Sequence, residues 1–203
     1  HALSMLNYLA STAHKELQSP PLTKAQRADE ALDWIIDRLE GLKLLRRKAK
    51  GIKFASEEAR FFANGGWLEE LVAHMVRELR ASRPSIQDAA RGIELMWSRE
   101  GEEVMNELDV AFLANNQLFI IECKTKRFEG KRSGQAADVI YKLDTLQELL
   151  GGVSTRALLV SYSPLKESDL KRAKALNIKV CSGRELRTLR EQLDAWVPTP
   201  QPR

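Results

Sequence analysis

Two acidic residues and a lysine, Asp109, Glu122 and Lys124, have the types and spacing of a cation-binding site. They lie in a mostly apolar stretch, and the central pair Asn115-Asn116 suits a two-residue hairpin turn because Asn tolerates the left-handed conformation. That turn places Asp109 opposite Glu122, with Lys124 further along the same face. Opposed carboxylates repel, and burying them is costly unless a cation lies between them. A divalent metal is the usual solution, and oxygen ligands favour magnesium or manganese over zinc.

The elements around this hairpin predict an α/β fold. Both hairpin faces are apolar, which is typical of strands in the middle of a helix-covered sheet. Before the hairpin, apolar periodicity indicates a helix over 67–79, a loop over 80–87 and a strand over 92–97. After it, the pattern indicates helices and strands that alternate over 135–150, 156–161, 167–176, 178–181 and 183–196. This order predicts a mixed central sheet flanked by helices.

Residues 1–60 are predicted to form a separate segment before a domain over 61–197 and a disordered tail over 198–203. Within it, the pattern indicates helices over 2–18 and 23–41 and then a basic hairpin over 42–54, which is the layout of a winged helix. The basic run of this hairpin is either a DNA-contacting wing or a solvated surface, and charge runs are often only the latter.

Composition adds weaker constraints. The net charge of +4 is compatible with nucleic acid without being specific for it. Two cysteines without a CxxC spacing indicate neither a disulfide framework nor a zinc site, and favour a reducing, cytoplasmic setting. The sequence contains no apolar run of membrane-span length and no signal-peptide pattern. Because it begins at His1 without Met, we expect that residues once preceded it.

The arrangement of Asp109, Glu122 and Lys124 resembles the active site of the PD-(D/E)xK nuclease superfamily. The resemblance implies a restriction-endonuclease-like sheet and hydrolysis of phosphodiester bonds in DNA or RNA. It implies Mg²⁺ or Mn²⁺ as cofactor, held by Asp109, Glu122 and the backbone carbonyl of Cys123. Lys124 is then expected to orient water or to stabilise the transition state.

Three sequence blocks resemble a narrower group, the CARF-containing ancillary nucleases of type III CRISPR systems: RFFANGGWLEELV, NELDVAFLANNQLFIIECKT and VIYKLDTLQELLGG. They correspond to the C-terminal nuclease part of those proteins. The resemblance implies antiviral defence, cleavage of single strands and a homodimer. The segment before Phe61 is too short and too helical for a Rossmann-like CARF domain, so we do not expect this chain to bind cyclic oligoadenylate.

Further residues are candidates for supporting roles. Glu69 lies at the edge of the apolar stripe of its helix, where it either adds a carboxylate or faces solvent. Gln135 and Lys142, seven residues apart, either contact phosphate or water, or simply border an amphipathic helix. The basic loop after the hairpin supplies candidate nucleic-acid contacts at Lys126, Arg127, Lys131 and Arg132.

Two other functions remain open at this level. The first alternative is a catalytically silent module that only binds nucleic acid, and the second is a dimerisation domain. A nuclease requires metal, whereas a binding module loses affinity as salt rises and needs no metal.

Overall fold

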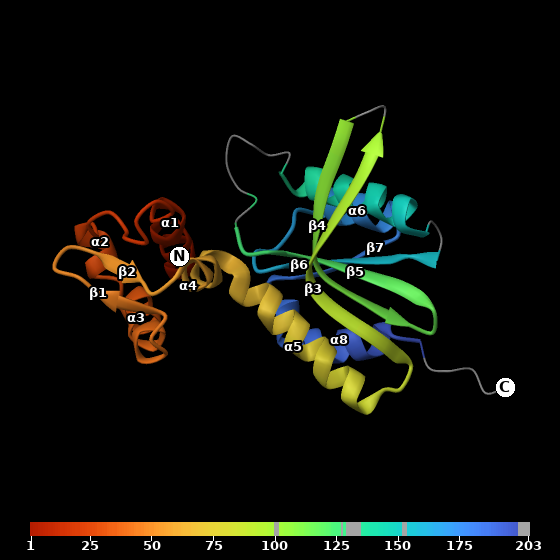
Figure 1. Cartoon of the computed structure of the whole chain (residues 1–203), viewed down its shortest axis with the longest axis horizontal. Helices are drawn as coiled ribbons and strands as arrows, with labels where there is room; N and C mark the ends of the chain where they lie inside the picture. The colour runs from red at the N-terminus through yellow and green to blue at the C-terminus, as the bar shows by residue number, and fades with distance from the viewer. Residues whose placement is uncertain (100–101, 127, 129–134, 152–153, 199–203) are drawn as a thin grey trace. The chain divides into compact units, whose positions relative to one another are not determined.

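The computed structural model describes residues 1–99, 102–126, 128, 135–151 and 154–198. The chain divides into two compact units, His1–Trp67 and Leu68–Arg203, which are described separately (Figure 1). Within the described ranges, no helix has both the length and the apolar character needed to cross a membrane.

The first unit contains helices and a short hairpin. Its elements are α1 (Ala2–Thr12), α2 (Lys24–Arg27), α3 (Glu30–Gly41), β1 (Leu45–Arg47), β2 (Ile52–Phe54), α4 (Glu57–Phe61) and the π-helix η1 (Phe62–Gly66). β1 and β2 pair antiparallel, as predicted for the basic hairpin. Leu9, Leu32, Ile36 and Phe54 are among the buried residues of its core.

Two helix boundaries in this unit differ from those predicted. The first helix ends at Thr12, and the backbone of Leu17 is left-handed, with φ of 59°, which ends any continuation to residue 18. Thr23 does cap a helix, through a reciprocal capping box with Gln26, but that helix is only four residues long. A second N-cap, Asp29, accepts the Leu32 N–H and begins α3.

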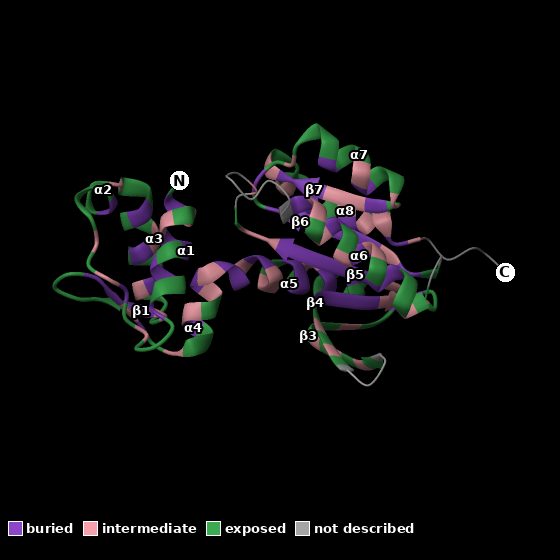
Figure 2. Ribbon diagram, turned by 90° about the horizontal axis from the view of Figure 1, so that it is seen from above, coloured by how far each residue is buried: buried purple, intermediate pink, exposed green. Residues whose placement is uncertain are grey.

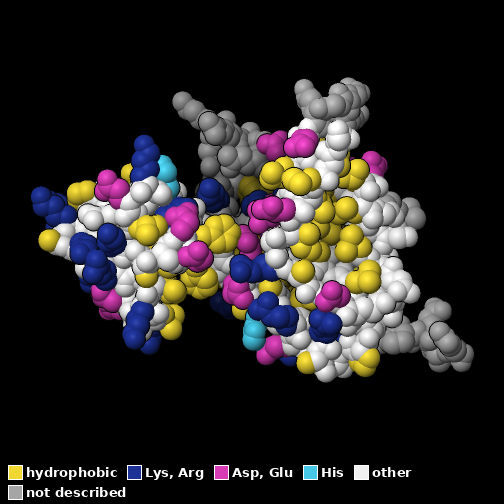
Figure 3. Space-filling view, viewed as in Figure 1, with side chains coloured by type: hydrophobic (Ala, Val, Ile, Leu, Met, Phe, Trp, Pro, Cys, Tyr) yellow, Lys and Arg dark blue, Asp and Glu magenta, His cyan; other side chains and the backbone are white. Residues whose placement is uncertain are grey.

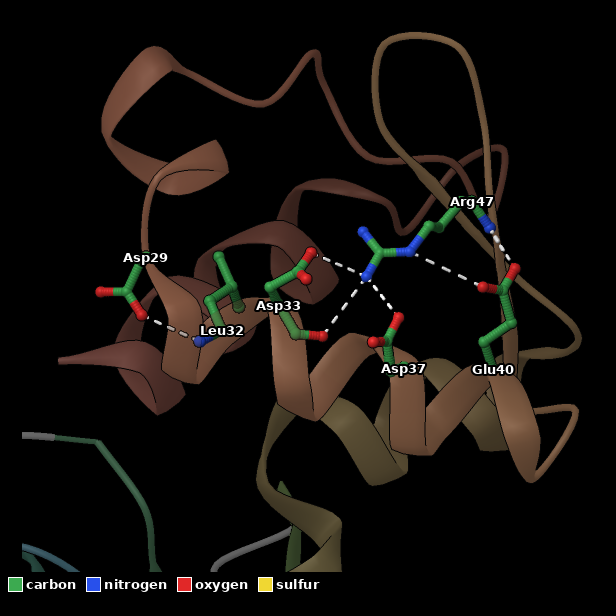
Figure 4. Close-up of polar contacts among 6 residues, drawn as sticks. All are labelled: Asp29, Leu32, Asp33, Asp37, Glu40 and Arg47. Carbon is green, nitrogen blue, oxygen red and sulfur yellow. Dashed lines mark hydrogen bonds and ion pairs between the residues drawn. The ribbon is translucent and has the colours of Figure 1, made fainter.

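One cation of the basic hairpin is held by acidic side chains of α3 (Figure 4). The Arg47 guanidinium donates to Asp33 at 2.7 Å and to Asp37 at 2.5 Å, and lies 3.7 Å from Glu40. Spacings of four and three residues place these three carboxylates on one helix face. Arg47 therefore joins β1 to α3. Figure 3 shows basic and acidic side chains interspersed over the visible face of this unit.

The second unit is built on a five-stranded mixed sheet, as predicted. Its strands are β3 (Ile86–Arg99), β4 (Glu102–Ala114), β5 (Gln117–Lys124), β6 (Arg156–Ser161) and β7 (Ile178–Ser182), in the spatial order β3-β4-β5-β6-β7. The first three strands are antiparallel, and β5, β6 and β7 are parallel. β5 therefore has an antiparallel neighbour on one side and a parallel neighbour on the other.

Helices cover both faces of this sheet, which places its central strands in the interior (Figure 2). α6 (Gln135–Gly151) and α7 (Glu167–Ala175) share a core with one face through Ile140, Leu143 and Ala173. On the other face, Trp196 at the end of α8 (Leu189–Trp196) packs nearly perpendicular to the rings of Phe112 and Phe119. α8 follows the 3₁₀ helix η3 (Gly183–Thr188) and pairs with α5 (Trp67–Ser82) through Arg190 and Glu78.

The edge strand is longer than predicted, and the preceding loop is shorter. α5 continues to Ser82 and β3 begins at Ile86, so most of the predicted loop over 80–87 belongs to these two elements. Polar residues such as Gln87 and Asp88 concealed the strand. They are exposed because β3 has a neighbour on one side only.

The central turn has the predicted conformation. Asn115 and Asn116 both have positive φ, 50° and 59°, as a two-residue type I′ turn requires. The ladder begins with Ala114 opposite Gln117 and continues to Val110 opposite Ile121, which is the predicted register.

Gly92 interrupts the β3–β4 ladder beside Asp109. Arg91 pairs with Val110 and Ile93 pairs with Leu108, whereas Gly92 has φ of 61°. The two-residue alternation of side chains also changes here, because Leu108 and Ala111 belong to the same core cluster although they are three residues apart. Gly92 of β3, with its left-handed backbone, thus lies opposite the part of β4 where the side chains change face.

We expect Gly92→Ala to destabilise the protein by about 1–2 kcal/mol, the usual cost of a left-handed L-residue. Steric overlap does not explain this cost, because an added Cβ lies 3.6 Å from Glu107 Oε1, an ordinary contact. Gly92→Asn should cost less, since Asn tolerates this conformation. Urea unfolding followed by circular dichroism measures both variants, and equal losses would exclude backbone conformation as the cause.

Candidate active site

The predicted site lies where β4 and β5 separate. Their ladder ends with Val110 opposite Ile121, yet β5 remains paired with β6 as far as Lys124, and β4 continues beside β3 (Figure 1). Asp109 and Glu122 are the next residues beyond the last pair. The strand pairing therefore opens a fork, which exposes backbone groups of both strands to side chains.

Asp109 occupies this fork. Its Oδ2 accepts the N–H of Cys123 at 2.6 Å, so a carboxylate bonds a backbone donor of β5 beyond the end of the ladder. The residue is buried, with 8% of its surface exposed. This hydrogen bond holds the carboxylate beside β5 and orients it toward the residues that follow Ile121.

Two lysines contact Glu122, which is also buried. Lys124 Nζ lies 2.5 Å from Glu122 Oε1 and 3.9 Å from Asp109 Oδ2, so its ammonium bridges the two carboxylates. Lys142, from α6, donates to Glu122 Oε2 at 3.0 Å and to the carbonyl oxygen of Glu107 at 3.3 Å. The Glu122 carboxylate thus has a cation at each oxygen.

The site remains rich in negative charge despite these lysines. Burial raises the pKa of Asp109 to about 6, assisted by repulsion from Glu122 and opposed by Lys124 and the Cys123 N–H. Burial also raises the pKa of Glu69 to about 7, with repulsion from Asp109 and Glu107 adding to it. Glu69, on α5, therefore belongs to the same electrostatic cluster.

Lys124 responds to the same charges. Burial alone lowers the pKa of its ammonium, but attraction to Glu122 and Asp109 outweighs burial, and the pKa is raised. Lys124 thus remains protonated at neutral pH between two acidic side chains.

The remaining predicted site residues have different positions. Gln135 is the first residue of α6, and its side chain lies outside what the structure describes. Lys126 is exposed just after β5, whereas the other three residues of the predicted basic loop, Arg127, Lys131 and Arg132, fall outside the described residues. The Cys123 thiol is buried, and burial raises its pKa, so it has no thiolate character to offer.

Sequence reasoning missed two contributors. The carbonyl of Glu107 anchors Lys142, and Gly92 shapes the strand next to Asp109. A glycine within an otherwise apolar strand is a signal of such an irregularity, but the carbonyl contact depends on how α6 packs and leaves no mark in the sequence.

The donor atoms suit a hard divalent cation, although they do not form a complete cage. Across the described residues, no three His, Cys, Asp or Glu side chains converge as a ready metal cluster. Asp109 and Glu122 nevertheless offer buried oxygens in a site with excess negative charge, and Lys124 already lies between them. Oxygen ligands of this kind, together with water and substrate oxygens, are typical of Mg²⁺ and Mn²⁺.

Two solved structures resemble the chain over nearly its whole length. The protein VC1899 from Vibrio cholerae is 39% identical with a TM-score of 0.88, over 97% of this chain and 50% of that one. Can2 from Sulfobacillus thermosulfidooxidans, solved with cyclic tetra-adenylate, is 31% identical with a TM-score of 0.75, over 97% of this chain and 51% of that one. The chain thus spans about half the length of each.

A comparison with curated protein sequences finds no match. The family model described as "Card1-like, endonuclease domain" matches residues 56–199, which include the whole β4–β5 fork and the helices that supply Glu69 and Lys142. By this match and by the similarity to the two solved structures, the chain belongs to the Card1-like endonuclease domain family.

Proposed function

We propose that this protein is a metal-dependent endonuclease that hydrolyses phosphodiester bonds in DNA or RNA. The observation that carries the proposal is the buried arrangement of Asp109, Glu122 and Lys124 at the β4–β5 fork of a Card1-like endonuclease domain. A surface ion-pair ladder does not fit, because both carboxylates are buried, and a buried acid with a raised pKa favours a functional site.

Asp109, Glu122 and the Cys123 carbonyl are the groups that would hold Mg²⁺ or Mn²⁺. Such an ion supplies a Lewis acid for the phosphate and acidifies water. The side chains of the chain itself account for the remaining requirements. The Lys124 ammonium lies beside both carboxylates, where it can neutralise charge that develops on phosphate oxygens. Lys142 fixes the other oxygen of Glu122 from α6.

The family and the net charge of the chain support a proposal for the substrate class. We infer a single-stranded polynucleotide and a role in CRISPR-linked or other antiviral defence, supported by the family match and the likeness to Can2. The net charge of +4 suits a polyanionic substrate. Cyclic tetra-adenylate is bound by Can2, a protein about twice as long as this chain, and our proposal for this chain concerns cleavage only.

We expect Lys124→Ala to lower the cleavage rate at least about a hundredfold, the usual effect of removing a transition-state charge partner. Lys171→Ala is the matched control, because Lys171 is exposed and pairs with the exposed Glu167. Labelled single- and double-stranded DNA and RNA, each with Mn²⁺ or with EDTA, provide the measurement. Full activity in folded Lys124→Ala would refute the proposed centre and favour a silent binding module.

Metal binding can be measured without any substrate. We expect wild-type protein to deplete the paramagnetic resonance signal of free Mn²⁺, and Glu122→Gln to bind it at least about tenfold more weakly, since a charged ligand oxygen is lost. Glu167→Gln, which changes an exposed carboxylate distant in sequence from the fork, should bind like wild type. Equal Mn²⁺ binding by all three proteins would place the metal elsewhere.

Asp109→Asn should raise the stability of the metal-free protein. At pH 8, above the pKa of about 6, Asp109 is ionised in a buried site that disfavours its charge. Asn removes that charge and can still accept the Cys123 N–H, so we expect a gain of about 1–3 kcal/mol in EDTA, at about 1.4 kcal/mol for each pKa unit. Thermal unfolding in EDTA measures the change. A loss of stability would show that this charge is already compensated without metal.

A further inference from the structure

A cavity lies at the end of the parallel strands opposite the candidate active site. It has a volume of about 560 Å³, and its lining residues include Gln117 and Arg156, which begin β5 and β6, and Ile178, which begins β7. Lys124 is at the opposite end of β5, seven residues from Gln117, or roughly 23 Å at the rise of a β-strand. This cavity is therefore separate from the candidate active site.

The charged side chains described in the lining of this cavity are all cationic. Arg156, Lys174 and Lys179 line the cavity, and its described lining contains no Asp or Glu. None of the three cations forms an ion pair with a carboxylate in the described part of the chain. Like charges around one hollow repel each other, and an anion within it would relieve that repulsion.

Neighbouring groups hold two of these cations in place. The Arg156 guanidinium lies over the Phe119 ring, 5.7 Å from its centroid, and one of its nitrogens donates to the Trp196 carbonyl at 3.5 Å. Lys179 Nζ donates to the Gln192 carbonyl at 3.2 Å, and burial lowers the pKa of this lysine. Both cations are therefore positioned before any ligand arrives, which reduces the entropic cost of binding.

The walls and the size narrow the class of anion. Leu170, Val180 and Trp196 add apolar and aromatic surface to the cations. A volume of this order matches sites for small organic ligands and exceeds the needs of an inorganic ion. A planar guanidinium with two nearby amines suits phosphate oxygens, and an aromatic side chain suits a base.

We propose that this cavity, formed by Arg156, Lys174, Lys179 and Trp196, binds a nucleotide through its phosphate. The nucleotide is either free or part of a polynucleotide, since both present the same phosphate and base. This site goes beyond the proposed cleavage reaction and does not depend on it, because none of its binding groups lies at the fork.

Lys174 is the residue to test, because it is exposed near the end of α7 and its replacement leaves the packed groups intact. Calorimetric titration in EDTA would use three probes: 5′-AMP, adenosine without phosphate, and a ten-residue oligothymidylate. We expect Lys174→Ala to weaken phosphate-dependent binding about tenfold, as for the loss of one charged hydrogen-bond partner. Lys171→Ala, on the same helix outside the lining, should bind like wild type.

The probes separate the two sources of phosphate. Lys174-dependent binding of 5′-AMP, with adenosine inactive, would identify a free nucleotide site. Lys174-dependent binding of the oligonucleotide alone would identify phosphate within a polymer. Binding that is unchanged in Lys174→Ala would overturn the proposal, and its loss in Lys124→Ala, which removes a cation of the fork, would then assign the nucleotide to the fork. Absence of binding by 5′-AMP and by the oligonucleotide would overturn it as well.

Discussion

The balance of charge between Asp109, Glu122 and Lys124 is the interaction on which the rest of the candidate active site depends. Two buried carboxylates on neighbouring strands are unfavourable by themselves, and the Lys124 ammonium offsets them only in part, since the pKa of Asp109 remains raised. The surrounding elements serve to hold this arrangement. Helices on both faces keep water from the strands, α6 brings Lys142 to Glu122, and the fork offers the Cys123 N–H to Asp109. A stable fold that retains such a charge excess is typical of a functional site.

Much of this site could be predicted because it depends on local rules. A two-residue Asn-Asn turn has a definite register, so the opposition of Asp109 and Glu122 followed from counting, and the ladder from Ala114 to Val110 has that register. The fork itself could not be predicted in this way. It arises because β5 follows β6 while β4 follows β3, and that divergence is a property of the whole sheet.

The differences elsewhere have equally physical causes. The sequence predicted one helix where the chain uses two N-caps, Thr23 and Asp29, because the apolar stripe from Ala28 to Leu39 was assigned to the Thr23 cap and the second cap was missed. The basic hairpin reads as a uniform positive run in sequence, yet Arg47 is engaged by three α3 carboxylates that lie close only once β1 packs on that helix. Tertiary pairing thus decides which charges are available, and composition alone does not.

The pairing of β5 on both edges has a consequence for ligand geometry. The middle of β5 is paired on both edges, with β4 up to Ile121 and with β6 from Phe119 onward, and this double pairing fixes the register and length of the strand. Groups at Gln117 and at Lys124 keep the same spacing whatever occupies either end. The same strand therefore fixes the separation between the candidate active site and the cavity that begins at Gln117.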